Sequence, residues 1–377
     1  MRPRNGEFGI FKRKVGDKAI FYYWTYDESG KRYYKSTGKL NWDEAVKYCR
    51  SLQLKGLLLS SSHSNFLAYF KDFFLYDECP YISDKLQRGY SYSKTWAQKQ
   101  RTILSTIIMP EFKDTIIKNI SALDLERFVK NLSTRGINGK TRNHVIAVIK
   151  AMFGYAQREG VIEINPAEKL RSFFVITREK GTLSKEELTE LFKVDKKSNL
   201  WPNDRHYLLN YVAAATGMRL GEILALRMCD IHDYRILVSH SWNSLDGLKG
   251  TKTGKTRVIP IGQQLFKALD RLSQSNQTEF IFSASNGKQP YDHKTVYRYF
   301  WQALGKIGIK PDIKEKRNIS FHSYRHTFNT LLLESGMNPE TVRLITGHSA
   351  KMTAHYSHLQ IPALSFDNNV VTGLEAN

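Results

Sequence analysis

The sequence predicts a multidomain fold that is mainly α-helical and contains small β-sheets. Its 377 residues exceed what one hydrophobic core commonly organises, since single domains usually hold about 100 to 200 residues. Short aromatic runs separated by turn residues mark its beginning, whereas apolar residues at intervals of three to four dominate the rest. Hydrophobic residues make up 41% and charged residues 25%, as in ordinary globular proteins, which excludes a disordered or fibrous chain.

Residues 1–58 are expected to form a three-stranded antiparallel sheet followed by a helix. Runs of aromatic and basic residues alternate there with turn-forming segments at 15–17 and 27–30. Asn41 is a candidate N-cap for a helix over residues 42–54, in which apolar residues recur at helical spacing. Because so small a unit buries little surface, its aromatic side chains need not all belong to a core.

Residues 62–160 are expected to form a small all-helical domain. Apolar residues recur there every three to four positions, and Pro, Gly, Ser or Asn bound each segment. The expected helices are 66–75, 95–108, 123–132 and 142–156. A mixed stretch with Asn165 and Pro166 follows, so we interpret residues 161–181 as an interdomain linker.

A third domain, residues 182–360, is predicted to be mixed α/β and mostly helical. Ser184 and Glu187 have the spacing of a capping box, which opens the first helix. The expected helices are 184–193, 205–215 and 219–226, and the expected strands are 236–240, 248–252 and 257–261. More helices follow, and residues 361–377 form a C-terminal tail.

The charge of the chain points to a polyanionic partner. There are 57 Lys and Arg residues against 36 Asp and Glu residues, which gives a net charge of +21 and a pI near 9.7. The excess is spread evenly over residues 1–60, 61–180 and 181–377. Nucleic acid is therefore the first partner to consider, with contacts from every domain. The alternative is that the excess lysine serves solubility alone.

Metal and membrane proteins are not indicated. The three cysteines, Cys49, Cys79 and Cys229, lie far apart and lack a second ligand at metal spacing, so neither a disulfide framework nor a zinc site is predicted. The sequence shows no signal-peptide pattern and no apolar run of about 18 residues. We expect a cytoplasmic protein without a metal, a cofactor or a membrane partner.

Four short strings in the third domain hold the candidate reactive residues. In the first, Thr216 and Gly217 break one helix, and Arg219 lies at the start of the next. A rigid guanidinium beside a helix N-terminus suits an anion. The alternative is a surface arginine paired with Glu222 or Asp230.

The second string, residues 250–260, is a hairpin-like turn in which Lys252, Lys255 and Arg257 crowd around Gly254. Basic residues on such a turn can contact phosphate or supply a proton. The alternative is that this turn only binds a nucleic-acid backbone.

The last two strings add histidines, an arginine and a tyrosine. His322 and Arg325 stand three positions apart, so on one helical face they could donate hydrogen bonds to two oxygens of one phosphate. His348 precedes Tyr356 by eight positions. A tyrosine hydroxyl has a pKa of about 10, so as a nucleophile it needs a base or a strongly cationic surrounding.

The ordered set Arg219, Lys252, His322, Arg325, His348 and Tyr356 resembles the tyrosine recombinase (phage integrase) family. The resemblance covers residues 180–360, which implies that 182–360 is the catalytic domain. The helical segment 64–160 resembles the family's core-binding domain. Residues 1–58 resemble the arm-type DNA-binding domain of the longer integrases.

The resemblance also implies a role for each residue. Arg219 and Arg325 would clamp the scissile phosphate, and Lys252 would protonate the leaving 5′ oxygen. The remaining roles are acid–base and orienting work for His322 and His348, and attack for Tyr356, which gives a 3′-phosphotyrosine. Fixed cations suit this chemistry, because they stabilise the negative charge of the transition state without a metal or cofactor.

Two details depart from or refine the pattern. In family members the tyrosine often follows the second histidine nine positions later, whereas in this chain it follows eight positions later. We prefer Lys252 over Lys249 and Lys255, because a lysine immediately before Thr-Gly matches the family turn.

Several further residues are assigned structural roles. Glu222 and Asp230 are expected to hold Arg219 and the helix after it. His326, His355 and His358 are taken as solvent-facing or packing residues.

The resemblance further implies the partners. These are double-stranded DNA with core and arm-type sites, a homotetramer acting through a four-way junction, and accessory DNA-bending or directionality proteins. The host would be a mobile element, and the protein would lie in the cytoplasm on the nucleoid. The tail, residues 361–377, is a candidate for exchange between protomers.

Two rival functions share part of this evidence. A type IB-like topoisomerase would use the same nucleophile and clamp, but it needs no arm-type domain. A non-catalytic DNA-binding protein would carry the charge without needing the ordered reactive set. Serine recombination and metal-dependent transposition are not predicted, because neither an N-terminal catalytic serine nor a carboxylate triad is recognisable.

Overall fold

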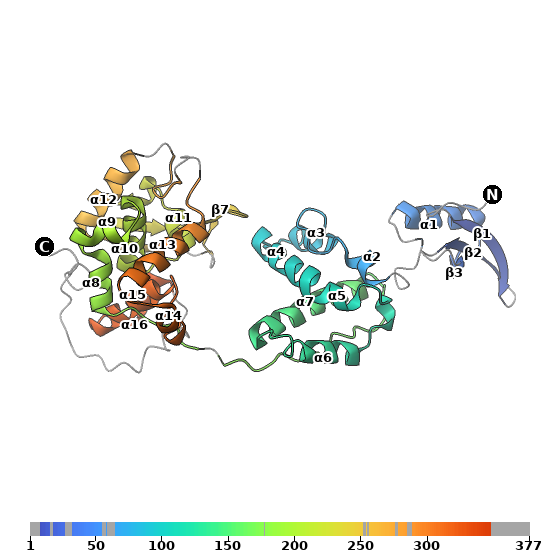
Figure 1. The fold of residues 1–377 in the computed structure, drawn as a ribbon. Coiled ribbons are helices and arrows are strands. Elements are labelled where there is room, and N and C mark those ends of the chain that lie inside the picture. Colours follow the sequence, from blue (N-terminus) through green and yellow to red (C-terminus); the bar gives the residue numbers. More distant parts are fainter. Residues whose placement is uncertain are drawn as a thin grey trace. The chain divides into compact units, whose positions relative to one another are not determined.

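The computed structural model describes residues 8–15, 18–26, 32–54, 58, 65–176, 178–251, 254, 256–275, 278–284 and 289–347. The predicted site residues Lys252, His348 and Tyr356 and the tail 361–377 lie outside the described residues. The chain divides into two compact units, Met1–Ile176 and Thr177–Asn377 (Figure 1).

The N-terminal part of the first unit is the expected three-stranded sheet and helix. Strands β1 (Gly9–Val15), β2 (Lys18–Tyr26) and β3 (Arg32–Ser36) pair antiparallel in chain order, and α1 (Trp42–Leu54) follows. The Asn41 side chain accepts a hydrogen bond of 2.8 Å from the Asp43 backbone N–H, as expected of an N-cap. Tyr23, Cys49 and Leu58 form a small buried core. Both predictions for this region are confirmed.

The opposite face of this sheet carries aromatic and basic side chains. Strand alternation and the strand register put Phe11, Arg13, Tyr22, Trp24, Tyr26, Arg32 and Tyr34 on this open sheet face. The Arg32 guanidinium lies over the Trp24 ring at 4.6 Å, and that of Arg13 lies over the Tyr22 ring at 5.6 Å. Tyr34 is 52% exposed, so these aromatics are not all core, as the sequence predicted.

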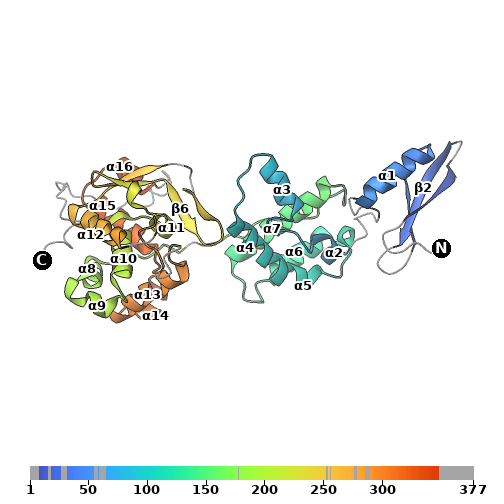
Figure 2. The ribbon, with the colours of Figure 1, turned by 90° about the horizontal axis from the view of Figure 1, so that it is seen from above.

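The rest of the first unit is helical. Its α-helices are α2 (Phe66–Phe70), α3 (Pro80–Gln87), α4 (Lys94–Ile103), α5 (Met109–Phe112), α6 (Ala122–Asn131) and α7 (Gly139–Arg158). A 3-10 turn, η3 (Ile117–Asn119), precedes α6. Helix α7 lies between α4 and α6, and its Val145, Ile149 and Phe153 pack into a core rich in phenylalanine (Figures 1 and 2).

Three local features differ from the sequence prediction, the first being that the helix expected over residues 66–75 ends at Phe70. The predicted helix 95–108 ends in a π-helical turn, η2 (Leu104–Ile108). Pro110 has no N–H to give to the Thr106 carbonyl, which favours such a widened turn. Helix α3 was not predicted; it has only eight residues, and its first is Pro80.

The first part of the predicted linker 161–181 packs against the first unit, and its last part packs against the second unit. Val161, Ile162, Ala167 and Leu170 belong to the core of the helical part. The Asn143 side chain then pairs with the Phe173 backbone, donating to its carbonyl at 2.9 Å and accepting from its N–H at 2.7 Å. On the other side, Asn318 Nδ2 donates to the Glu179 carbonyl at 2.7 Å.

The second unit is mixed α/β and mostly helical, as predicted. Its helices are α8 (Lys185–Phe192), α9 (Lys197–Leu200), α10 (Asp204–Thr216), α11 (Leu220–Leu224), α12 (Gln263–Gln274), α13 (His293–Lys306), α14 (Pro311–Lys316), α15 (Ser323–Glu334) and α16 (Pro339–Thr346), with 3-10 turns η4 (Val194–Lys196) and η5 (Met228–Asp230). The predicted capping box of Ser184 and Glu187 opens α8.

Two small antiparallel sheets lie in the same unit. Strands β4 (Ile231–His232), β5 (Arg235–Val238) and β8 (Arg257–Pro260) form one sheet in the order β4-β5-β8. Strands β6 (His240–Asn243) and β7 (Gly247–Gly250) form the other. Strands β7 and β8, which precede and follow Lys252 in the sequence, therefore belong to different sheets and do not pair with each other as a hairpin.

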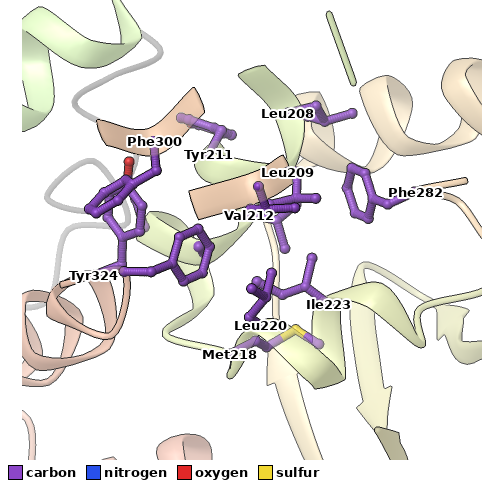
Figure 3. Packing of buried hydrophobic residues seen from close by; sticks show 14 of the residues in the cluster. Leu208, Leu209, Tyr211, Val212, Met218, Leu220, Ile223, Phe282, Phe300 and Tyr324 are labelled. Atoms are coloured by element: carbon purple, nitrogen blue, oxygen red, sulfur yellow. The ribbon is translucent and has the colours of Figure 1, made fainter. Parts of the chain in front are cut away.

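Helix α10 lies in the centre of the second unit. Its residues are buried on nearly all sides, including the polar His206, Asn210 and Thr216, as expected of a helix surrounded by other elements. Figure 3 shows Leu209 and Val212 within a cluster that also holds Phe282, Phe300 and Tyr324. The two ends of a helix packed on every side are fixed, so the chain that leaves α10 starts from a defined position.

No helix within the described ranges is long and apolar enough to cross a membrane.

The buried His206 on α10 makes the free energy of unfolding depend on pH. Its ring lies against those of Tyr291 and Tyr299, and burial, followed by the positive charge of Arg298, lowers its pKa to about 4. The usual value of 6.5 holds for the unfolded chain. Between these two values the unfolded chain binds a proton that the folded chain does not, so the free energy of unfolding falls as pH falls from about 6.5 to about 4.

We expect the share of His206 in this loss to reach at most about 3 kcal/mol, and we expect His206→Phe to remove that share and to leave the shares of His293 and His322, whose pKa values are also lowered. Urea denaturation of the full chain at pH 7 and pH 5 measures both proteins. A variant that loses as much stability as wild type between these pH values would contradict the assignment to His206.

Candidate active site

The position of Arg219 follows from the end of α10. Gly217 ends this helix with φ +60, a left-handed conformation that favours glycine. A Cβ atom there would lie 2.6 Å from Cδ1 of Phe328, so a larger residue does not fit. Two residues later Arg219 becomes the N-cap of α11, at the start of the helix as the sequence predicted.

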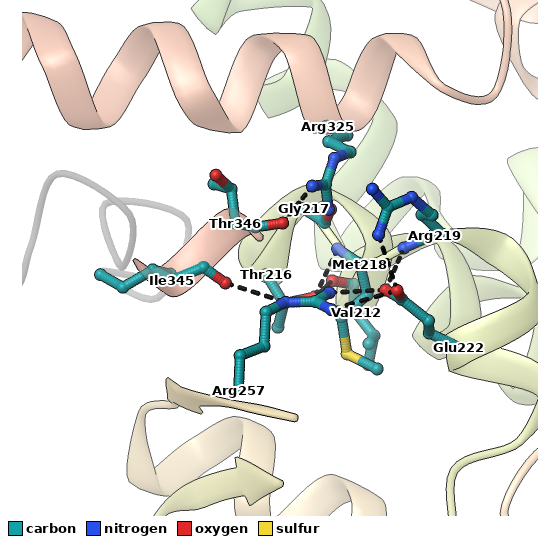
Figure 4. A network of polar contacts seen from close by, with 10 residues as sticks. All are labelled: Val212, Thr216, Gly217, Met218, Arg219, Glu222, Arg257, Arg325, Ile345 and Thr346. Carbon is teal, nitrogen blue, oxygen red and sulfur yellow. Dashed lines mark hydrogen bonds and ion pairs between the residues drawn. The ribbon is translucent and has the colours of Figure 1, made fainter. Parts of the chain in front are cut away.

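A buried carboxylate connects Arg219 to a second arginine. Glu222 is 2% exposed and accepts hydrogen bonds from the Arg219 backbone N–H and from Arg219 Nη1, both at 2.9 Å. Arg257 of β8 donates to the same carboxylate, from Nη1 at 3.1 Å and from Nη2 at 2.5 Å. We call these three residues the Glu222 cluster (Figure 4).

The charge state of Glu222 is fixed by its partners. Burial by itself raises the pKa of this carboxyl, but the hydrogen bonds and charge of Arg257, and then those of Arg219, lower it to about 2. Glu222 is therefore ionised at neutral pH. One negative charge faces two positive charges, so the cluster carries a net charge of +1.

The two arginines of the cluster differ in their access to solvent. The Arg219 side chain is 30% exposed, whereas that of Arg257 is 8% exposed. Within the described part of the chain, the Arg219 side chain has a hydrogen bond from Nη1 alone, so Nε and Nη2 remain for another acceptor. Arg219 is thus the member of the cluster that can bind an anion from outside.

Arg325 holds two backbone segments together. It is 1% exposed, and it donates from Nη1 to the Gly217 carbonyl at 2.8 Å and from Nη2 to the Thr346 carbonyl. The first segment leads to Arg219, and the second is the end of α16, two residues before His348 in the sequence (Figure 4). A predicted phosphate ligand therefore also joins two backbone segments of the site.

His322 lies at the N-cap of α15, directly before the helix that carries Arg325. The residue is exposed, yet the protein packed around its ring, and then the positive charges of His326, Arg325, Arg219 and Lys180, lower its pKa to about 4. The ring is therefore neutral at pH 7 and able to accept a proton. The charges that act on it show that Arg219, His322 and Arg325 lie in one region.

Two residues of this region were not part of the predicted catalytic set. Lys180 belongs to the predicted linker, and its Nζ donates to Asn318 Oδ1 at 3.2 Å. Arg257 was placed among the turn residues, without its partner Glu222. A signal for Arg257 was present, because strand alternation puts it on the same face of β8 as the fully buried Ile259.

The expectation for Asp230 was wrong in part. Asp230 is structural, but it binds Arg227 and not Arg219, accepting from Nε at 3.1 Å and from Nη2 at 3.3 Å. It lies in η5, after the end of α11, whereas Arg219 lies before the start of that helix. His326 is 7% exposed and packs on His322, in agreement with a packing role.

Comparison with known proteins identifies relatives of this unit. Residues 182–361 match the sequence model of the phage integrase family. The tyrosine recombinase XerA of Pyrococcus furiosus is 29% identical over 237 residues, which are 62% of this chain and 74% of that protein.

Two kinds of solved structure share the fold. The Tn1549 transposon integrase in complex with a circular intermediate DNA has a TM-score of 0.58 at 22% identity, over 78% of this chain and 97% of that one. The lambda integrase in a tetramer bound to a Holliday junction has a TM-score of 0.59 at 18% identity, over 94% of this chain and 95% of that one.

The different environments of the two predicted phosphate ligands give a stability prediction. Arg325→Lys leaves at least one buried carbonyl without its donor, so it should lower the free energy of unfolding by about 2 to 3 kcal/mol. Arg219→Lys keeps a charge beside Glu222, which Arg257 still pairs, so the loss should stay within about 1 kcal/mol. Thermal and urea denaturation measure the stability of both variants. Equal losses would contradict the claim that the more deeply buried Arg325 contributes more to stability than Arg219 does.

Proposed function

Because residues 182–361 match the sequence model of the phage integrase family, we propose that this chain is a tyrosine recombinase, which cuts and rejoins DNA at specific sites through a covalent link between Tyr356 and a backbone phosphate. The observation that supports this most is the Glu222 cluster, which offers a partly exposed Arg219 to an anion beside the neutral His322. A phosphodiester is an anion that needs both a cation and a proton acceptor for its cleavage.

The proposed reaction has two balanced steps. The Tyr356 Oη atom attacks phosphorus, the bond from phosphorus to the 5′ oxygen breaks, and a 3′-phosphotyrosyl link forms. The tyrosine proton passes to the neutral His322, and Lys252 donates a proton to the leaving 5′ oxygen. In the second step, a 5′ hydroxyl from another strand attacks phosphorus and gives its proton to the neutral Lys252, while the bond to the tyrosine oxygen breaks and Tyr356 takes back a proton from His322.

Arg219 and Arg325 are proposed to hold the scissile phosphate during both steps, with His348 orienting it. Arg219 approaches it with Nε and Nη2. Arg325 would contact the phosphate from its position beside the Gly217 and Thr346 carbonyls, to which it donates. Both cations are fixed before DNA arrives, so little reorganisation is needed when negative charge develops on the phosphate oxygens.

Two further regions are proposed to bind double-stranded DNA. The helical part of the first unit would bind the core site next to the point of cleavage. The open sheet face would bind a second, arm-type site, because its stacked arginines Arg13 and Arg32 present cations at an aromatic surface. Such a second site serves a protein that joins distant DNA segments.

We further propose that the chain acts for a mobile element as a homotetramer on a four-way junction. Its structural neighbours include the Tn1549 transposon integrase and a lambda integrase tetramer bound to a Holliday junction. Accessory DNA-bending or directionality proteins would assist, and the protein would act on the nucleoid in the cytoplasm. The C-terminal tail would pass between protomers.

A type IB-like topoisomerase is the second candidate, since it would form the same covalent intermediate. The open sheet face favours recombination, because relaxation requires no second recognition site. Exchange of strands between two duplexes, assayed on a synthetic four-way junction, separates the two functions.

The nucleophile is tested with a nicked duplex that traps the covalent intermediate, made from pooled genomic fragments where the site is not known. Wild type should give a slowly migrating protein–DNA adduct on a denaturing gel, and Tyr356→Phe should give none, because it lacks the attacking oxygen. Tyr234→Phe, at an exposed tyrosine of the same unit, is the matched control and should react as wild type does. An adduct from Tyr356→Phe would place the nucleophile elsewhere.

DNA affinity should fall steeply with salt, because cations that neutralise phosphates release bound counterions. The slope of log K against log salt should be about −0.9 for each phosphate contacted. Replacing Arg13 and Arg32 by Gln should make the slope less steep by about 2 on arm-type DNA and leave it unchanged on core-site DNA. Titrations at four salt concentrations measure this, and a flat response of wild type would contradict phosphate contacts.

A further inference from the structure

Arg257 contacts both Glu222 and the end of α16. Besides its two bonds to Glu222, it donates from Nε to the Ile345 carbonyl at 3.0 Å. Three of its N–H groups thus bind three oxygens from two other parts of the unit. The side chain is 8% exposed, so the protein surrounds nearly all of it.

The aliphatic part of the Arg257 side chain also lies close to Gly347, directly after α16. Gly347 follows this helix with φ +66, and a Cβ atom there would lie 3.2 Å from Cδ of Arg257. The next residue in the chain is His348, and Tyr356 follows eight positions later. The Arg257 side chain therefore contacts Glu222 of α11, the helix that begins at Arg219. It also contacts the end of α16, which precedes the proposed nucleophile in the sequence.

The number of hydrogen bonds that each arginine makes to Glu222 determines how many N–H groups of Arg219 can bind a phosphate. Arg257 binds both carboxylate oxygens, and Arg219 adds one side-chain bond. If Arg257 were absent, the buried carboxylate would have Arg219 as its remaining cation in the cluster. A two-pronged guanidinium–carboxylate pair is the favoured geometry, so Arg219 would turn its free N–H groups toward Glu222 and away from an incoming phosphate.

We propose that Arg257 is a positioning residue for DNA cleavage, which keeps Arg219 available for the scissile phosphate. This inference rests on the proposed cleavage site. Arg257 itself does not touch the DNA, because its donors are bound to protein and its side chain is covered.

The test compares Arg257→Met with wild type on the nicked duplex, under single turnover and with saturating protein. Misplacement of reacting groups by about 1 Å costs roughly 100-fold in rate, so adduct formation should slow about 100-fold. The dissociation constant for DNA should change by less than about threefold. The salt slope should stay that of wild type, whereas Arg219→Met should lose about one phosphate contact from it.

A double variant tests whether Arg257 acts through Arg219. Because both substitutions disturb the same contact to phosphate, Arg219→Met combined with Arg257→Met should react about as slowly as Arg219→Met alone. Arg257→Lys should remain slow, because one ammonium group cannot bind three oxygens in two directions.

Arg317→Met is the control for loss of a two-pronged arginine–glutamate pair outside the Glu222 cluster; this pair is partly exposed, with 35% of the Arg317 side chain accessible. Arg317 also binds a glutamate through two N–H groups, Glu187 at 2.5 and 2.9 Å, and it donates to the Thr182 carbonyl at 2.8 Å. Its substitution should lower the melting temperature and leave the rate of adduct formation within about threefold of wild type. Should Arg257→Met not fold, Arg257→Lys supplies the rates, the salt slope and the combination with Arg219→Met.

These measurements decide whether Arg257 acts on cleavage through Arg219. A folded Arg257 variant that reacts at the wild-type rate, a double variant with multiplied effects, or an Arg257 variant with a reduced salt slope would overturn the inference. The last result would make Arg257 a direct phosphate ligand. In all three cases wild type still forms its adduct, so the proposed function would stand; absence of the wild-type adduct would overturn both.

Discussion

The buried carboxylate of Glu222 is the constraint on which the rest of the site depends. A buried charge is costly unless it is paired and fully hydrogen-bonded, and Glu222 meets this condition only with donors from both Arg219 and Arg257. These donors come from the start of α11 and from β8, which lie 35 residues apart at the Glu222–Arg257 contact. The pairing therefore aligns two parts of the unit and leaves one cation partly exposed.

The central helix α10 supplies the frame for this arrangement. Its burial fixes where Gly217 lies, and the left-handed turn there directs the chain into α11. Arg325, from 108 residues further along, caps the same turn by binding the Gly217 carbonyl. The cations of the site are thus held by backbone carbonyls and a carboxylate. This rigidity suits stabilisation of a transition state, since fixed charges need not reorganise during the reaction.

Much of the fold could be predicted from the sequence, because the signals are local. Alternation predicted the N-terminal strands, and Asn41 and Ser184 marked helix starts by their own side-chain hydrogen bonds. The site was predicted as a set of residues from order and resemblance. Helix α3 was missed because eight residues carry too little periodicity, and the π-helical turn depends on Pro110 within an otherwise regular pattern.

The pairing of charges could not be predicted in the same way. Glu222 and Asp230 each lie near an arginine in sequence, and only the path of the chain around α11 assigns Asp230 to Arg227. The contact between Arg257 and Glu222 is a tertiary one, so no local pattern reveals it.

A crystal structure of the Tyr356→Phe protein on a duplex that contains its cleavage site tests the central claim most directly. The account predicts one backbone phosphate within hydrogen-bond distance of Arg219, His322 and Arg325, with Glu222 still bridging Arg219 and Arg257. A phosphate held away from Arg219, or an Arg257 side chain that has left Glu222 to bind DNA, would contradict it.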